Sequence, residues 1–200
     1  MSNAVFFNSY KIKKDSSAPE FTQSVDNLVR EYASKQPGFN SMALLHNDEM
    51  WADFAIFETM EDAKSFENPT ESNEHAEKFY SFLNFSTCKS RMFSVEKECL
   101  IKSEIPKAVT LVTFTLKKDA LMPDFLLAKD NVYKFLPSAN KGCIASRFLT
   151  NGDMWADLVF WQSIDDVKNT AEYENDVFRK YFSFINKVTF TQHFNVEQWH

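Results

Sequence analysis

The sequence is poor in glycine, cysteine and histidine, and each scarcity removes a class of functional site. Only three Gly occur among 200 residues, so a glycine-rich loop that cradles phosphate is excluded. The three Cys are an odd number without close spacing, which predicts reduced thiols rather than a disulfide framework. The four His and the Cys show no metal-ligand spacing, so no metal site is expected.

Basic clusters and long apolar runs are also missing. The formal net charge is −6 and no basic run occurs, whereas neutralising nucleic-acid phosphates requires clustered Lys and Arg. No apolar run approaches the roughly 20 residues of a membrane helix. The N-terminal residues show no signal-peptide pattern. We therefore expect a cytoplasmic protein with neither a nucleic-acid nor a membrane partner.

Aromatic residues, by contrast, are abundant. They make up 16% of the chain, and 21 residues are Phe. This composition is typical of a core filled with Phe, which is the simpler interpretation. It also fits a ligand pocket lined by aromatic faces.

One stretch of the chain occurs twice. Met50–Phe54 reads MWADF and returns as MWADL at Met154–Leu158, 104 positions later. Further matches are Lys13–Asp15 with Lys117–Asp119, Gly38 with Gly142, and Ser81–Asn84 with Ser183–Asn186. The offset shrinks to 102 and then 101 toward the end. A colinear match with small indels and a period of domain size indicates a duplicated domain rather than a solenoid.

Hydrophobic periodicity predicts the order βαββαβ in each copy. In the first copy the predicted strands are 5–12, 39–45, 50–57 and 87–95, with helices after Pro19 and Thr59 and a break in the second helix at 68–69. In the second copy they are 109–116, 143–150, 154–161 and 188–196, with helices 123–136, 164–170 and 174–186. The predicted domains are 1–96 and 108–200, joined by a polar linker at 97–107.

The order βαββαβ predicts an α+β fold of two ferredoxin-like domains, each with two helices on one face of a four-stranded antiparallel sheet. The other face of each sheet is left bare. We expect the two copies to bury these faces against each other, with the helices outside.

Three features resemble the antibiotic biosynthesis monooxygenase family: the element order, the broken second helix, and a third strand that ends in an aromatic residue followed by Ser/Thr-x-x-Asp. The signature is clearest at Trp161–Ser163 and has drifted to Phe57–Thr59 in the first copy. The resemblance covers about 1–96 and 108–200. It implies an intrachain pseudo-dimeric α+β barrel with one cavity per half. The family includes cofactor-free oxygenases of polycyclic aromatics, haem-degrading enzymes and many members of unknown role.

Two strand carboxylates are candidate catalytic residues. Alternation places Asp53 on the same face as Trp51, and Asp157 on the same face as Trp155 and Trp161. The resemblance implies that this face points toward the helices and the cavity. Each Asp is then either a general base or a carboxylate held by hydrogen bonds because the fold needs it. The structural role is favoured, since fold-building residues tend to survive in both halves of a duplication.

Further candidates lie on the same face. Asn8, in the first strand, is either an amide that binds a carbonyl or oxygen species, or a polar residue bonded to a neighbour. Its counterpart in the second copy is Val112. The aromatic candidates for contact with a substrate are Trp51, Trp155, Trp161 and Tyr10. Arg147 is expected to pair with a carboxylate rather than to bind an anion.

These features favour a cofactor-independent monooxygenase acting on a small aromatic or polyketide-like substrate, with no cofactor. The alternatives are a non-catalytic protein that binds a small apolar molecule, and a structural pseudo-dimer with filled cavities. Association beyond the internal pseudo-dimer is left open.

Degradation of haem is not expected. The resemblance assigns that reaction to an Asn on the first strand, a Trp closing the third strand and a His on the second helix, all in one half. The first copy has Asn8 and His75 but Phe57 in place of the Trp, and the second has Trp161 with Val112 and Val177.

Overall fold

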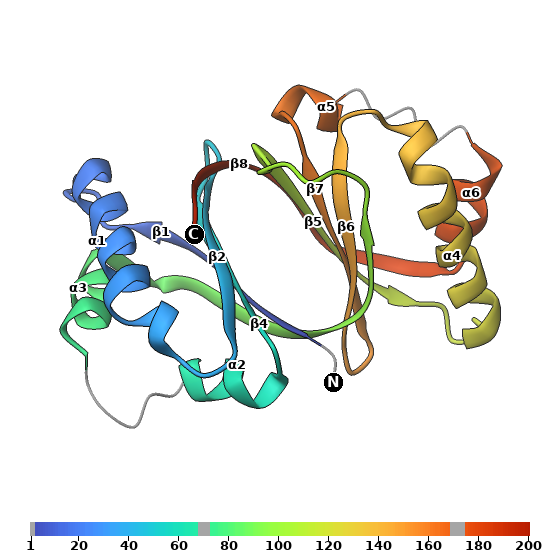
Figure 1. The fold of residues 1–200 in the computed structure, drawn as a ribbon. Coiled ribbons are helices and arrows are strands. Elements are labelled where there is room, and N and C mark those ends of the chain that lie inside the picture. Colours follow the sequence, from blue (N-terminus) through green and yellow to red (C-terminus); the bar gives the residue numbers. More distant parts are fainter. Residues whose placement is uncertain (1–2, 68–72, 169–174) are drawn as a thin grey trace. The chain divides into compact units, whose positions relative to one another are not determined.

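The chain repeats the order strand, helix, strand, strand, helix, strand, and each repeat builds one sheet covered by helices (Figure 1). The computed structural model describes residues 3–67, 73–168 and 175–200. It divides into two units, Met1–Val95 with Val196–His200 and Glu96–Asn195. The predicted α+β fold with two βαββαβ repeats is confirmed.

The first unit contains a four-stranded antiparallel sheet in the order β4-β1-β3-β2. Its elements are β1 Ala4–Ile12, α1 Ala18–Glu31, η1 Ala33–Lys35, β2 Phe39–His46, β3 Trp51–Phe57, α2 Met60–Glu67, α3 Glu74–Phe82 and β4 Leu83–Leu100. Side chains from α1, α3 and one face of the sheet form a single apolar core.

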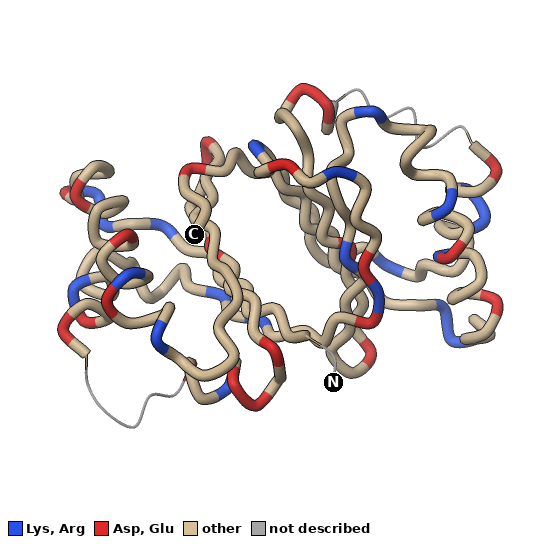
Figure 2. The backbone as a smooth tube through the Cα atoms, viewed as in Figure 1, with Lys and Arg blue, Asp and Glu red and all other residues tan. Residues whose placement is uncertain are grey.

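The second unit repeats this plan with the strand order β8-β5-β7-β6. Its elements are β5 Ala108–Leu116, α4 Met122–Ala139, β6 Cys143–Asn151, β7 Met154–Trp161, α5 Ile164–Lys168, α6 Asp176–Phe182 and β8 Ile185–Trp199. Its core lies between the sheet and the helices α4 and α6. Figure 2 shows acidic and basic residues interspersed over the helices and loops, while the strands are mostly uncharged.

The helix α1 shows how the sequence determines these elements. The Ser17 hydroxyl caps the first turn by accepting a hydrogen bond from the Glu20 amide at 3.4 Å. Phe21, Val25 and Leu28 then form a buried stripe at helical spacing. The stripe faces the sheet, so burial of these side chains holds the helix against it.

The duplicated Gly and the Ser/Thr-x-x-Asp signature have one structural explanation. Thr59 donates a hydrogen bond to the Asp62 carboxylate at 2.6 Å and accepts one from the Asp62 amide at 3.1 Å. The Asp62 side chain packs onto Gly38, where an added Cβ would come within 2.3 Å of Oδ2. Gly142 lies equally close to Asp166 in the second unit. The Asp of the signature thus packs directly against the distant Gly, which explains why both occur in each repeat.

Matched aromatic contacts agree with the alignment of the two copies. Phe21 stacks on Phe79 with centroids 5.9 Å apart, and Phe125 stacks on Tyr181 at 5.7 Å. The strand register agrees as well, because Asp53 pairs with residue 8 and Asp157 pairs with residue 112, each on the first strand of its own repeat.

Several predicted boundaries shift. The strand β4 continues to Leu100, so the segment expected as a linker from 97 to 107 begins inside a strand, and the amides of Ile101 and Lys102 donate to the Ile144 carbonyl. The helix predicted to reach 186 ends at Phe182, because Ile185 pairs with Leu116 in the sheet.

Other expectations have a different outcome. The predicted helix break at 68–69 and the residues 169, 170 and 174 lie outside the described residues. Among the described residues, no helix combines the length and hydropathy needed to cross a membrane. Packing of the two sheets face to face stays a prediction.

Candidate functional site in the second unit

A cavity of about 880 Å³ lies between the sheet and the helices of the second unit. Its wall is formed by β5, β7 and β8 together with α4 and α6 and is mostly apolar, with contributions from Val112, Phe114, Val132, Leu136, Val159, Trp161, Phe178, Phe182 and Val188. This volume is that of a small-molecule site. Six of its polar side chains form two hydrogen-bonded groups.

The first group is centred on Asp157. Its carboxylate forms an ion pair with the Lys129 ammonium through Oδ1 and accepts a hydrogen bond from the Tyr181 hydroxyl through Oδ2 at 2.8 Å. The side chain of Lys129 is only 3% exposed and that of Asp157 is 15% exposed. Both residues line the cavity. The pair is therefore a buried charge pair at the wall of an apolar chamber.

Three aromatic rings surround the Lys129 ammonium. Its nitrogen lies 4.5 Å from the ring centroid of Tyr133 and 5.0 Å from those of Phe148 and Tyr181. Ring faces attract a cation, and the attraction is stronger where water is excluded. The rings come from α4, β6 and α6, so three elements fix the position of the charge.

The second group joins Trp161, Thr110 and His193. The Trp161 indole donates to the Thr110 hydroxyl oxygen at 3.0 Å, and that oxygen lies 2.9 Å from Nδ1 of His193. An indole nitrogen can only donate, so the Thr110 hydroxyl retains its own proton for His193. Burial lowers the pKa of His193, which keeps the imidazole neutral at physiological pH.

The tyrosines near the cavity are also neutral. Burial, followed by the nearby Asp157 charge, raises the pKa of Tyr181 well above its ordinary value. The same two causes raise the pKa of Tyr133, whose hydroxyl donates to the Ser146 carbonyl at 3.3 Å. Lys129 and Asp157 are thus the only oppositely charged pair on the described wall of the cavity.

Asp53, the counterpart of Asp157 in the first unit, has a different environment. It is 3% exposed and accepts a 2.8 Å hydrogen bond from the Asn8 amide through Oδ1. Its Oδ2 and the neighbouring Tyr10 hydroxyl are buried and make no hydrogen bond of standard geometry among the described residues. Burial raises the pKa of Asp53 to about 6, against the opposing effects of the Asn8 and Tyr10 donors.

The polar wall of the cavity is confined to one copy. At the positions that match Lys129, Tyr133, Tyr181, Thr110 and Trp161, the first unit has Val25, Val29, Phe79, Phe6 and Phe57. All five are buried in its apolar core. Both units therefore have the strand carboxylate, and these five polar positions are found in only one of them.

The structure separates the residues predicted from the sequence into three sets. Asp157 and Trp161 line the cavity. Asp53, Asn8 and Tyr10 lie together in the first unit.

The remaining two, Trp51 and Trp155, are in the aromatic cores. Trp51 packs against Phe21 at 5.0 Å, and Trp155 stacks on Phe148 at 5.0 Å. Each strand Asp accepts a side-chain hydrogen bond, as the structural role considered for it requires. The predicted pairing of Arg147 with a carboxylate is confirmed, with Glu98 at 2.8 Å.

Sequence reasoning missed Lys129, Tyr181 and Thr110 as members of the site. A signal for Lys129 was available, because it follows Phe125 and precedes Val132 in the apolar stripe of α4. A Lys in a core-facing stripe is rarely fully buried unless it has a partner. Thr110 and Tyr181 gave no comparable signal, since both residue types are common in strands and helix cores.

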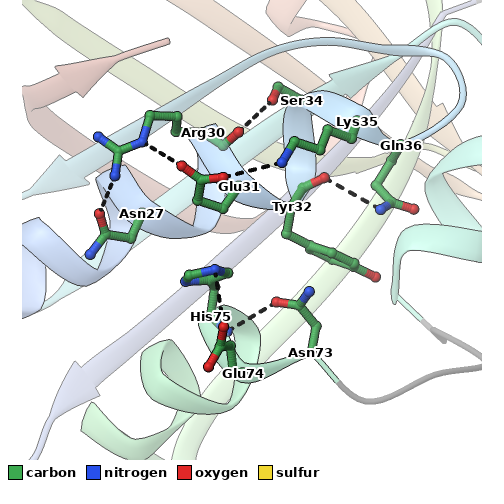
Figure 3. Close-up of polar contacts among 10 residues, drawn as sticks. All are labelled: Asn27, Arg30, Glu31, Tyr32, Ser34, Lys35, Gln36, Asn73, Glu74 and His75. Atoms are coloured by element: carbon green, nitrogen blue, oxygen red, sulfur yellow. Dashed lines mark hydrogen bonds and ion pairs between the residues drawn. The ribbon is translucent and has the colours of Figure 1, made fainter.

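The remaining His candidate lies elsewhere. Figure 3 shows His75 on the first turn of α3, where Asn73 caps the helix and the imidazole lies 3.7 Å from the exposed Glu74 carboxylate. Within the described ranges, no group of three or more His, Cys, Asp or Glu side chains is arranged to hold a metal ion.

Solved structures share the fold across nearly the whole chain. An anthrone oxidase-like protein has a TM-score of 0.63 at 11% identity, covering 100% of this chain and 93% of its own. A ferredoxin-fold protein from Listeria monocytogenes related to antibiotic biosynthesis monooxygenases has a TM-score of 0.60 at 10% identity, covering 98% and 95%. A chlorite dismutase-like protein has a TM-score of 0.64 at 13% identity, again covering 98% and 95%.

Sequence comparison adds no relative. No protein-family model matches the chain, and no curated protein matches it. The structures that share the fold are described by different activities, so the likeness does not determine the reaction. The chain has the fold of the ferredoxin-like proteins related to antibiotic biosynthesis monooxygenases.

Proposed function

We propose that the second unit binds a small aromatic molecule and oxygenates it without a cofactor, with Asp157 as the general base. The observation that carries this proposal is a carboxylate at the wall of a largely apolar cavity of about 880 Å³. An apolar chamber excludes water from a reactive carbanion or phenolate, and aromatic walls orient a flat substrate. The shared fold of an anthrone oxidase-like protein supports the same class of reaction.

The reaction would begin with transfer of an acidic proton from the substrate to Asp157. The resulting anion is electron-rich and reduces O₂ directly, after which one oxygen atom bonds to the substrate carbon. Two substrate hydrogens leave with the other oxygen atom as water. The protein contributes a base, orientation and a dry environment, while the substrate supplies the electrons.

The first unit has a structural role in this proposal. Its matching positions are filled by Val25, Val29, Phe79, Phe6 and Phe57. Asp53 and Asn8, predicted as catalytic from the sequence, form a buried hydrogen bond there. The two strand carboxylates therefore provide a matched pair, with one at the cavity and one in an apolar core.

Oxygen uptake with aromatic hydroquinones tests this function. We expect the protein to consume O₂ faster than uncatalysed autoxidation, and Asp157→Asn to lower the rate by about 10²-fold or more. Asp53→Asn is the control and should retain the wild-type rate. Equal loss in the two variants, or no rate above autoxidation with any hydroquinone that binds, would reject the assignment.

A further inference from the structure

We infer that the Lys129 ammonium exchanges one anionic partner for another when a ligand binds. A neutral ligand with an acidic hydroxyl group transfers its proton to Asp157, and the ligand oxygen then takes the place of the Asp157 carboxylate at the ammonium. The cavity therefore selects neutral molecules that carry such a hydroxyl group. This inference rests on the proposed function, because it concerns the ligand of the same cavity. It assigns a role to Lys129 that goes beyond that of a counter-ion for Asp157.

The fold does not require Lys129 in order to accommodate the strand carboxylate. Asp53 occupies the matching position in the first unit with Asn8 as its hydrogen-bond donor and with Val25 at the position of Lys129. The neutral donors Asn8 and Tyr10, without a cation, therefore suffice for a buried carboxylate in this fold. The lysine in the second unit must be explained by something that the two copies do not share, and the other polar groups on the cavity wall, which have apolar counterparts in the first unit, are such a difference.

Stability does not explain the lysine either. Removing two charges from water costs free energy that their attraction repays only in part, and apolar residues of similar volume are often as stable or more so. The first unit contains that apolar alternative in Val25 and Phe79. A buried ion pair in the wall of a cavity is better explained by action on a ligand.

The charge balance of the cavity determines which ligands it accepts. Lys129 and Asp157 carry opposite charges, and the pKa of His193 is lowered so that it is neutral. A carboxylate ligand would bring a second negative charge beside Asp157, and a cationic ligand a second positive charge beside Lys129. A neutral hydroxyl compound leaves the balance at zero.

Proton transfer inside the cavity preserves this balance. The O–H bond of the ligand breaks, a new O–H bond forms on Asp157, and the ligand keeps the electron pair. Before the transfer Lys129 faces the Asp157 carboxylate, and afterwards it faces the ligand oxyanion, so one positive and one negative charge remain. Neither oxidant nor reductant takes part in this step.

The geometry allows the exchange without movement of the cation. An ammonium has three donors, and Lys129 makes one bond to Asp157 while three ring faces surround it at 4.5 to 5.0 Å. The rings hold the nitrogen in place when a hydrogen bond moves from one oxygen to another. Lys129 and Asp157 both line the cavity, so one ligand oxygen can approach both.

Titration of bound 2-naphthol tests the inference, since its neutral and ionised forms absorb at different wavelengths. We expect naphthol bound to the wild-type protein to absorb as naphtholate at least about one pH unit below the pH at which free naphthol is ionised to the same extent, a tenfold shift of the equilibrium. In the double variant Lys129→Met with Asp157→Asn, which is neutral at both positions, the shift should disappear.

Two further ligands separate this inference from the proposed function. The neutral ether 2-methoxynaphthalene cannot ionise and should bind to both the wild-type protein and the double variant, whereas 2-naphthoate should bind more weakly than naphthol. If naphthol and its ether bind but naphthol ionises at the same pH as in solution, the exchange at Lys129 is wrong and the binding function stands. If neither compound binds, the proposed function fails.

Discussion

The two strand carboxylates should respond in opposite directions to the same substitution. Asp53→Asn removes a charge that is buried in the first unit beside the neutral donors Asn8 and Tyr10, whereas Asp157→Asn removes one that is paired with Lys129. In Asp53→Asn, Asn8 can still donate to the side-chain oxygen. The new amide group can donate to the Tyr10 hydroxyl oxygen, which makes no hydrogen bond of standard geometry among the described residues.

The size of the effect follows from the pKa of Asp53. Burial raises this pKa from 3.8 to about 6, and two pH units correspond to about 3 kcal/mol. Between these values the folded protein holds a proton that the unfolded chain has released, so the free energy of unfolding falls as the pH rises. Above about pH 6 the full cost is present, and Asp53→Asn should remove it.

The opposite result is expected for Asp157→Asn. The substitution leaves the Lys129 ammonium, which is 3% exposed, without its carboxylate. Breaking a buried pair by removing one partner costs about 3–5 kcal/mol. At pH 7.5 we therefore expect Asp53→Asn to be more stable than the wild-type protein by up to about 3 kcal/mol, and Asp157→Asn to be less stable.

Urea denaturation measured at several pH values between 4 and 8 provides the assay. Other groups titrate in this range, so the quantity to compare is the wild-type free energy of unfolding minus that of Asp53→Asn. This difference should decline from pH 4 to pH 6 and then remain constant. A difference independent of pH, or a loss of stability in Asp53→Asn as large as that in Asp157→Asn, would refute the argument.

Three further predictions concern single positions. Lys129→Met leaves Asp157 with only the Tyr181 hydroxyl as a hydrogen-bond donor. Thermal unfolding should show that the variant is less stable by about 3 kcal/mol or more, and adding Asp157→Asn to the same chain should partly restore the stability. Gly38 and Gly152 both have positive φ values (+66 and +59), but a Cβ added at Gly38 would lie 2.3 Å from the Asp62 carboxylate, whereas one added at Gly152 would meet open space. Gly38→Ala should therefore lose clearly more stability than the roughly 1 kcal/mol expected of Gly152→Ala from backbone strain alone. Equal losses of stability would contradict the packing explanation of the duplicated Gly. Ser17→Ala removes the cap of α1 and should cost about 1 kcal/mol in urea denaturation, while Ser16→Ala beside it should change little.

The fold could be predicted from the sequence because its determinants are local and occur twice. The stripe of Phe21, Val25 and Leu28, the capping Thr59 and the alternating Trp-Ala-Asp strand each specify an element by spacing alone. The ends of elements were less predictable. An apolar run such as Phe182 to Ile185 fits a helix and a strand equally, and only pairing with Leu116 decides where the strand begins.

The site was predicted in part, for a physical reason. Asp157 and Trp161 stood out because strand alternation places them on one face of β7 and the family resemblance implies that this face points toward the helices. Lys129 and Tyr181 reach the same carboxylate from α4 and α6. The positions of Lys129 and Tyr181 in the sequence do not predict their contacts with Asp157, because these contacts depend on how the two helices pack on the sheet.

The difference between the two halves was also hidden in the sequence. Asp53 and Asp157 occupy the same motif, so the repeat alone does not indicate which of them lies in a functional site. What separates them is the set of partners of each carboxylate, which are the neutral Asn8 and Tyr10 for Asp53 and the charged Lys129 with Tyr181 for Asp157. Such sets can be compared only after the two copies have been aligned element by element.

The central claim is that the ligand binds in the second unit alone, and isothermal titration calorimetry with 2-methoxynaphthalene tests it most directly. Val112 lines the cavity and its counterpart in the first unit is Asn8. The wild-type protein should bind one molecule per chain, Val112→Phe should fill the cavity and abolish binding, and Asn8→Val should bind as the wild-type protein does. Undiminished binding by Val112→Phe, or loss of binding in a folded Asn8→Val variant, would contradict the assignment of the site to the second unit.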